Sequence, residues 1–146
     1  QFYNQYHNKI EEVIISLLND NIVPILISIH SFTRKFRDKI RPWEISILWD
    51  SDDRISASLI DLLERDNKYV IGNNQPYKGY LRGDTLYTHA TSRGLPHVLI
   101  EIRNDLIADD DGQEKIANYL TKKLCQVISI NHKNLSKMKH YGTKSI

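Results

Sequence analysis

Several features that mark particular protein classes are scarce in this sequence. It has a single cysteine, Cys125, so no disulfide can form within the chain and no zinc site can be built from cysteines. No apolar run approaches the roughly 20 residues of a membrane span, and no signal peptide is visible. The net charge of +2 is small, which disfavours a dedicated nucleic-acid-binding protein. We therefore expect a cytoplasmic protein that binds neither membranes nor nucleic acid.

What the sequence contains is the composition of an ordinary globular domain. Of its 146 residues, 40% are hydrophobic and 26% are charged, and this length suits one domain with a buried core. We predict a single domain over residues 1–130 and a loose, basic tail over residues 131–146. The chain begins with Gln1, and we expect it to be part of a longer protein.

Apolar periodicity predicts helices that alternate with strands. Helical spacing occurs over residues 7–18, 53–63, 86–93 and 108–130, and apolar strand patterns occur over residues 22–29, 43–50, 68–72 and 95–103. This order predicts a three-layer α/β/α fold with a mostly parallel or mixed sheet. The run over residues 22–29 is apolar throughout, so we expect a central strand that is covered on both faces, with Pro24 near its beginning.

Polar side chains stand at the ends of three predicted strands. His30 ends the first strand, Glu101 and Arg103 lie near the end of another, and a polar loop follows Gly72. Ligands bind beyond the carboxyl ends of the strands in such sheets. If the strands are parallel, these side chains converge on one site.

The residue types at these positions suit metal-assisted hydrolysis. An imidazole such as His30 can bind zinc, which lowers the pKa of a bound water to about 7. A carboxylate such as Glu101 can then carry a proton to the leaving group. Arg103 is suited to a two-pronged contact with a substrate carboxylate, and Asn73 and Tyr77 are suited to donate hydrogen bonds to a polarised carbonyl.

Each of these residues also has a structural interpretation. A histidine at a strand end is often held by hydrogen bonds at the edge of a core. Glu101 and Arg103 can form an ion pair that serves only the fold. Asn73 and Tyr77 can be turn residues. The residue pattern alone leaves both interpretations open.

Four motifs in one order carry a resemblance to a known family. They are "IHSFT", "RPWEISILWDSDDRIS", "VIGNNQPYKGY" and "GDTLYTHATSRGLPHVLIEIRNDLI". Together they resemble the N-formylglutamate amidohydrolase family, a relative of the zinc carboxypeptidases, from residue 3 to about residue 127. The resemblance implies a zinc-carboxypeptidase-like fold of the phosphorylase/hydrolase-like kind. It also implies zinc-dependent cleavage of N-formyl-L-glutamate to formate and glutamate.

The resemblance also implies roles for individual residues. His30 in "IHSF" would be a metal ligand, and Glu101 in "IEIR" would be the catalytic carboxylate that activates water. The positions that it places near the substrate, an N-acylated acidic amino acid, are Asn73, Tyr77, His89 and Arg103.

The sequence also departs from the family pattern. The family takes two more zinc ligands, a histidine and an acidic residue, from an N-terminal segment that also carries an Asn-Arg pair for the substrate carboxylate. Neither element is visible here, and Arg34 stands where the motif usually has proline. We therefore expect the C-terminal part of the family's domain, incomplete for zinc binding and activity. A missing N-terminal unit would expose a sheet edge, which favours a homo-oligomer.

Two alternatives to this function stay open. The chain can be a truncated or inactive relative that serves as a small-molecule-binding or assembly module. It can also be a zinc hydrolase that acts on a peptide or on another acylated amino acid.

Overall fold

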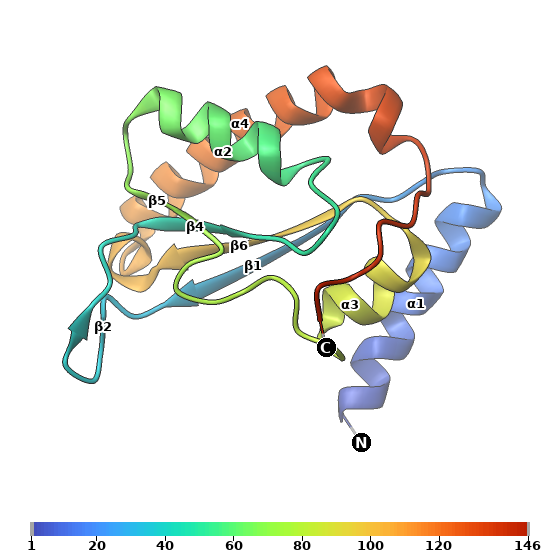
Figure 1. The fold of residues 1–146 in the computed structure, drawn as a ribbon, viewed down its shortest axis with the longest axis horizontal. Helices are drawn as coiled ribbons and strands as arrows, with labels where there is room; N and C mark the ends of the chain where they lie inside the picture. The colour runs from blue at the N-terminus through green and yellow to red at the C-terminus, as the bar shows by residue number, and fades with distance from the viewer. Residues whose placement is uncertain (1, 146) are drawn as a thin grey trace.

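A mixed four-stranded sheet organises the chain (Figure 1). The computed structural model describes residues 2–145. The strands lie in the order β1 (Leu26–Phe32), β6 (His97–Arg103), β4 (Ile45–Leu48) and β5 (Ile71–Asn73). β1 is parallel to β6, β6 is antiparallel to β4, and β4 is parallel to β5. The prediction of an α/β fold with a mixed sheet is confirmed. The helices are α1 (Phe2–Asn19), α2 (Ser56–Asp66), α3 (Thr85–His89) and α4 (Asp110–Leu135).

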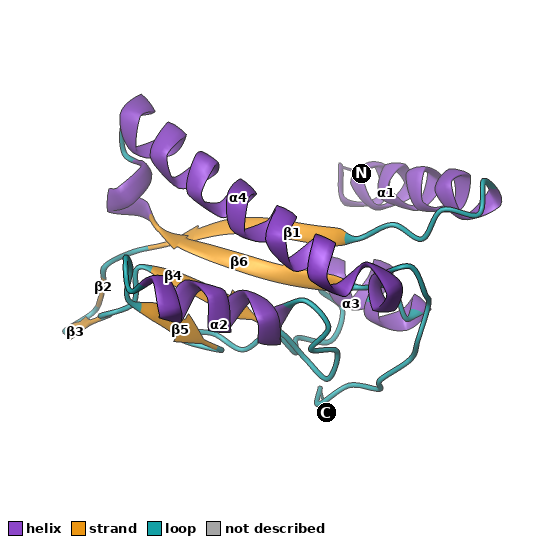
Figure 2. Ribbon diagram, turned by 90° about the horizontal axis from the view of Figure 1, so that it is seen from above, coloured by secondary structure: helices purple, strands orange, loops and turns teal. Residues whose placement is uncertain are grey.

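Alternation along the strands gives the sheet two different faces. Val98, Ile100 and Ile102 of β6 belong to the main hydrophobic core, together with Ile45 and Ile47 of β4. Helices α2 and α4 cover this face (Figures 1 and 2). Residues between these positions point to the opposite face, because successive strand side chains alternate. Glu101 is one of them.

Helices α1 and α3 lie side by side near the amino ends of β1 and β6 (Figures 1 and 2). Ile14 of α1 packs there with Ala90 and Leu95 in a second, smaller core. The rest of this face carries the loop over residues 74–84. The helical layer opposite α2 and α4 is therefore short. Beyond it, the loop covers this second face of the sheet toward the carboxyl ends of β1 and β6.

Strand β1 differs from its prediction in position and in surroundings. It begins at Leu26 instead of residue 22, because Pro24 has no N–H for the ladder. The amide of Leu26 donates instead to the Pro96 carbonyl (2.9 Å). Within residues 2–145, β1 is an edge strand rather than a central one, and Ile29 is 54% exposed. The strand runs on to Phe32, so His30 lies inside it.

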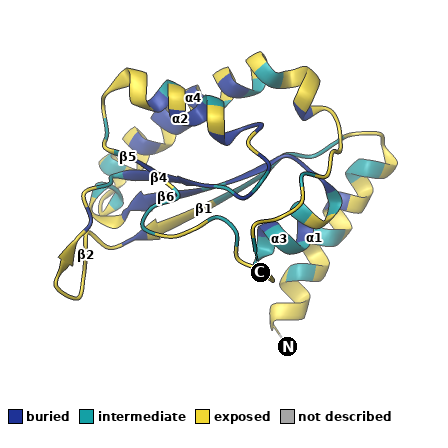
Figure 3. Cartoon of the chain, viewed as in Figure 1, coloured by how far each residue is buried: buried dark blue, intermediate teal, exposed yellow. Residues whose placement is uncertain are grey.

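The basic segment over residues 33–41 forms a hairpin, although the sequence showed no strand pattern there. Strands β2 (Lys35–Phe36) and β3 (Lys39–Ile40) pair, and Arg37 adopts a left-handed φ of 54° in the turn. The hairpin projects from the carboxyl end of β1, and its tip is exposed (Figures 1 and 3).

The end of the chain is more ordered than predicted. Helix α4 continues to Leu135, so the predicted tail boundary at residue 131 falls inside a helix. The following segment folds back onto the domain: the amide of Lys139 donates to the Gly94 carbonyl (2.8 Å), and the amide of Lys144 donates to the Asp50 carboxylate (2.6 Å). Among the described helices, none combines the length and the apolar character that a membrane crossing needs.

Candidate active site

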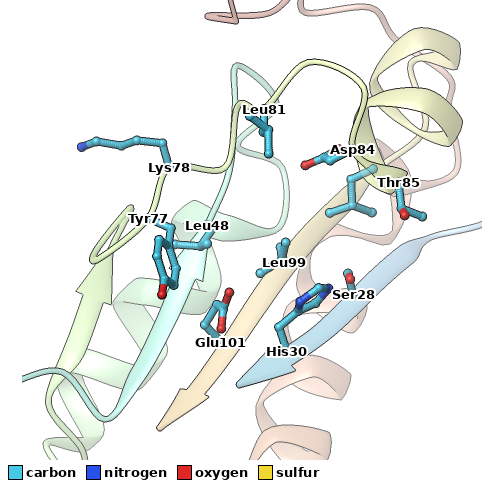
Figure 4. Close-up of a pocket in the computed structure, with 11 residues that line it drawn as sticks. Ser28, His30, Leu48, Tyr77, Lys78, Leu81, Asp84, Thr85, Leu99 and Glu101 are labelled. Carbon is cyan, nitrogen blue, oxygen red and sulfur yellow. The ribbon is translucent and has the colours of Figure 1, made fainter. Parts of the chain in front are cut away.

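His30 and Glu101 are neighbours across two parallel strands. They are direct partners in the register of β1 and β6, and both point to the face opposite α2 and α4 (Figure 4). The strand pattern predicted that these two side chains converge. The pairing places an imidazole and a carboxylate side by side on the same face of the sheet.

Both side chains line a cavity of about 280 Å³ on this face. β1, β4 and β6 form its floor, and the loop over residues 77–84 with the first residues of α3 forms its wall (Figure 4). Gly79 lets this loop lie against β4, because a Cβ there would clash with the backbone nitrogen of Trp49. The lining residues are Ser28, His30, Leu48, Tyr77, Lys78, Leu81, Asp84, Thr85, Leu86, Leu99 and Glu101.

Glu101 is a buried carboxylate with an unused oxygen. The residue is 7% exposed, and its Oε2 atom has no hydrogen-bond partner among the described residues. Burial raises the pKa of the Glu101 carboxyl, and the positive charges of His30 and Arg41 offset part of the rise. A carboxyl with a raised pKa takes up and releases a proton at a higher pH than an exposed glutamate, which suits a proton carrier.

The side chains at the cavity supply part of the donor set that a zinc site needs. The exposed imidazole of His30 and the unpartnered Oε2 atom of Glu101 face one cavity, and both are donor types that zinc accepts. Within residues 2–145, however, no group of three His, Cys, Asp or Glu side chains is arranged to hold a metal. His30 therefore fits as one ligand of a site that the described residues do not complete.

Tyr77 lies at the cavity, whereas Asn73 does not line it. Tyr77 is 44% exposed and faces the same space as Glu101 (Figure 4). The Oδ1 atom of Asn73 accepts a hydrogen bond from Nε1 of Trp49 (2.8 Å). The neighbouring Asn74 accepts from the amides of Trp49 and Gly79 (both 3.0 Å). The two asparagines thus hold the loop in place.

Arg103 is engaged in ion pairs outside the cavity. Its Nε atom donates to Asp105 (2.6 Å), and its Nη2 atom donates to Glu44 (3.3 Å). The hydrogen bond to Asp105 is the main reason why the pKa of Arg103 is raised further. Arg103 does pair with carboxylates, but neither of them is Glu101.

His89 lies under α1, away from the cavity. It is 2% exposed, and its Nε2 atom lies 2.7 Å from Nδ1 of His7. Burial lowers the pKa of His89, and the neighbouring His7 and Arg93 lower it further, against an opposing effect of Glu11. Its position joins α3 to α1.

Four further polar residues line the cavity and were not predicted from the sequence. Ser28 lies on β1 two residues before His30, so strand alternation could have placed it on the same face. Asp84 caps α3, and its carboxylate accepts from the amide of Tyr87 (2.6 Å). Lys78 reaches the cavity through the path of the loop, and Thr85 reaches it from the first position of α3.

Comparisons with a family model and with solved structures give matches to this chain. A family model described as N-formylglutamate amidohydrolase matches residues 1–108. The chain is also similar to the crystal structure of a gene product from Agrobacterium tumefaciens, with 32% sequence identity over 87% of this chain and a TM-score of 0.79. This chain covers 50% of that chain and so spans half the length of the structure it matches. No curated protein gives a significant match.

Proposed function

This chain belongs to the N-formylglutamate amidohydrolase family, and from that premise we propose that it contributes to a zinc-dependent hydrolase that cleaves N-formyl-L-glutamate into formate and glutamate. The register pairing of His30 with Glu101 at one cavity carries the proposal, because it joins a metal-binding side chain to a proton-carrying one. In fold terms we propose a zinc-carboxypeptidase-like domain.

Glu101 is the proposed general base and acid. As water attacks the formyl carbon, the carboxylate takes one proton from the water. The carbon–nitrogen bond then breaks, and Glu101 gives that proton to the departing amine of glutamate. The second water proton is released when formic acid ionises to formate. The low exposure and unused Oε2 atom of Glu101 support this role, since nothing in residues 2–145 competes for that oxygen.

His30 is the proposed zinc ligand. When bound, zinc polarises a carbonyl and lowers the pKa of a water molecule. Catalytic zinc sites use about three protein ligands. The remaining ligands are therefore proposed to come from residues outside this chain. The longer length of the solved relative is consistent with this proposal.

Of the four predicted substrate-binding residues, Tyr77 is the one that lines the cavity. Its side chain faces Glu101 across the cavity (Figure 4), where a hydroxyl can donate to a polarised carbonyl. Asn73, Arg103 and His89 are proposed to act indirectly, by holding the loop, the end of β6 and α3.

The direct test measures formate release from N-formyl-L-glutamate by the zinc-loaded full-length protein, which includes the proposed further ligands. We expect Glu101→Gln to lower kcat by about 10²- to 10⁴-fold, because it removes the proton carrier and keeps the side chain's shape. Asp61→Asn is the matched control, since it removes a carboxylate that is half exposed on α2. A fully active Glu101→Gln enzyme would refute the assigned role. Absence of formate release by the wild-type protein would favour an inactive, ligand-binding relative.

A further inference from the structure

Arg41 is a buried cation that lacks a carboxylate partner. It is 8% exposed, yet no Asp or Glu of residues 2–145 lies within ion-pair distance of it. Its side-chain hydrogen bonds go to the carbonyl and the hydroxyl of Thr33, and both are long, at 3.3 and 3.5 Å. Burying a charge is costly unless it is paired. The guanidinium therefore keeps most of its capacity to bind an anion.

Aromatic rings hold this guanidinium beside the cavity. Its carbon Cζ lies 5.0 Å from the ring centroids of Phe36 and Tyr77, and 5.9 Å from that of Phe32. Such contacts partly compensate a cation without neutralising it. Tyr77 lines the cavity, so the positive charge stands at its rim. The charge also acts on the catalytic carboxylate, since it lowers the pKa of Glu101.

Two other buried arginines are different in this respect. Arg103 is paired with Asp105 and Glu44, and Arg54 is paired with Asp52 at 2.6 Å. Their charges are already matched by the protein's own carboxylates. The carboxylate-binding role that the sequence suggested for Arg103 thus lacks a free guanidinium there, whereas Arg41 offers one next to the cavity.

We propose that Arg41, presented by the β2–β3 hairpin, binds a carboxylate of the substrate and selects for acidic N-acyl amino acids. This proposal rests on the proposed function. In it, Arg41 is the residue that recognises the negative charge of the substrate. The planar guanidinium can form two parallel hydrogen bonds with a carboxylate. The rings of Phe36 and Tyr77 keep it oriented while the position of the anion is empty.

Binding to three probes tests this assignment. They are N-formyl-L-glutamate, its diamide, in which both carboxylates are carboxamides, and glutarate, which has carboxylates but no formyl group. Calorimetry on the wild-type protein should show tighter binding of N-formyl-L-glutamate than of the diamide. Arg41→Gln should weaken binding of N-formyl-L-glutamate and glutarate by about 10- to 100-fold, the usual effect of losing a charged hydrogen-bonding partner. Binding of the diamide should be unchanged.

Two further variants separate recognition from folding. Arg41→Lys keeps the charge without the planar fork, so it should restore part of the lost affinity. Arg37→Gln removes an arginine from the exposed turn of the same hairpin and should leave all three affinities unchanged. An unaltered affinity of the diamide for Arg41→Gln, together with a cooperative thermal transition, shows that this variant is folded.

The outcomes distinguish this inference from the proposed function. If N-formyl-L-glutamate binds equally to wild type and Arg41→Gln, or if Arg41→Gln weakens the diamide to the same extent, the role of Arg41 is refuted while the hydrolase proposal stands. If glutarate binds in an Arg41-dependent way but neither formyl compound is bound or cleaved, the anion site stands and the proposed function fails. If the wild-type protein binds none of the probes, both are refuted.

Discussion

Glu101 shows at the scale of one residue how the proposed chemistry opposes stability. Its burial without a partner for Oε2 favours the protonated form in the folded protein, so the pKa is raised above its ordinary value. A group of this kind stabilises the fold fully below its unfolded pKa, and that contribution is lost as the pH rises through the folded pKa. Keeping an ionised carboxyl here at neutral pH therefore costs stability.

The corresponding prediction concerns the metal-free protein. At pH 7.5 Glu101→Gln should raise the free energy of unfolding by about 1–3 kcal/mol, because it removes a buried charge that lacks a partner. Below pH 4.5, the ordinary pKa of a glutamic acid, the two proteins should differ much less. Urea unfolding at both pH values measures this difference. A variant that is less stable than wild type at pH 7.5 would show that Glu101 is a structural ion.

At the scale of elements, a histidine pair links α1 to α3 beside the second, smaller core. His7 and His89 can share a hydrogen bond while at least one imidazole is neutral, and Arg93 and Glu11 face the same pair. The pKa of His89 is lowered in the folded state, so its contribution to stability is present above pH 6.5 and is lost as the pH falls toward the folded pKa.

A variant of His89 tests this contact. His89→Gln should cost about 1–2 kcal/mol at pH 7.5 because it breaks a buried contact. Its stability should then fall less than that of wild type between pH 7.5 and pH 5. Denaturant unfolding at the two pH values gives the comparison, with the exposed His140→Gln as control. Equal acid sensitivity of wild type and His89→Gln would contradict the account.

Contacts between neighbouring strands were easier to predict from the sequence than contacts between distant segments. The convergence of His30 and Glu101 was predictable because the strand patterns placed both residues near the carboxyl ends of parallel strands, although β1 continues to Phe32 and His30 lies inside it. The role of Arg103 was not, because its partner Glu44 is 59 residues away and meets it only across the folded sheet. Arg41 follows β3, in a segment where the sequence showed no helix or strand pattern. Its burial depends on rings at positions 32, 36 and 77, which only the hairpin and the loop bring together.

On the scale of the whole molecule, the two faces of the sheet have different roles: one carries the main core and the other carries the cavity. The face under α2 and α4 carries the main core, and the opposite face leaves the carboxyl ends of β1 and β6 open toward the cavity. The buried Arg54 joins distant parts of the chain, since it binds Asp52 and the carbonyls of Gly94, Asn134 and Lys137. The packed face therefore supports a site on the opposite face of the sheet.

The central claim is that His30 and Glu101 serve one metal-dependent site, and locating zinc in the protein tests it most directly. A crystal of the full-length protein, soaked in zinc and measured at the zinc absorption edge, should show an anomalous peak about 2.0–2.1 Å from an imidazole nitrogen of His30, inside the cavity that Glu101 lines. The peak should vanish in His30→Ala crystals. Zinc bound elsewhere, with no peak at His30 in the wild-type protein, would contradict the account.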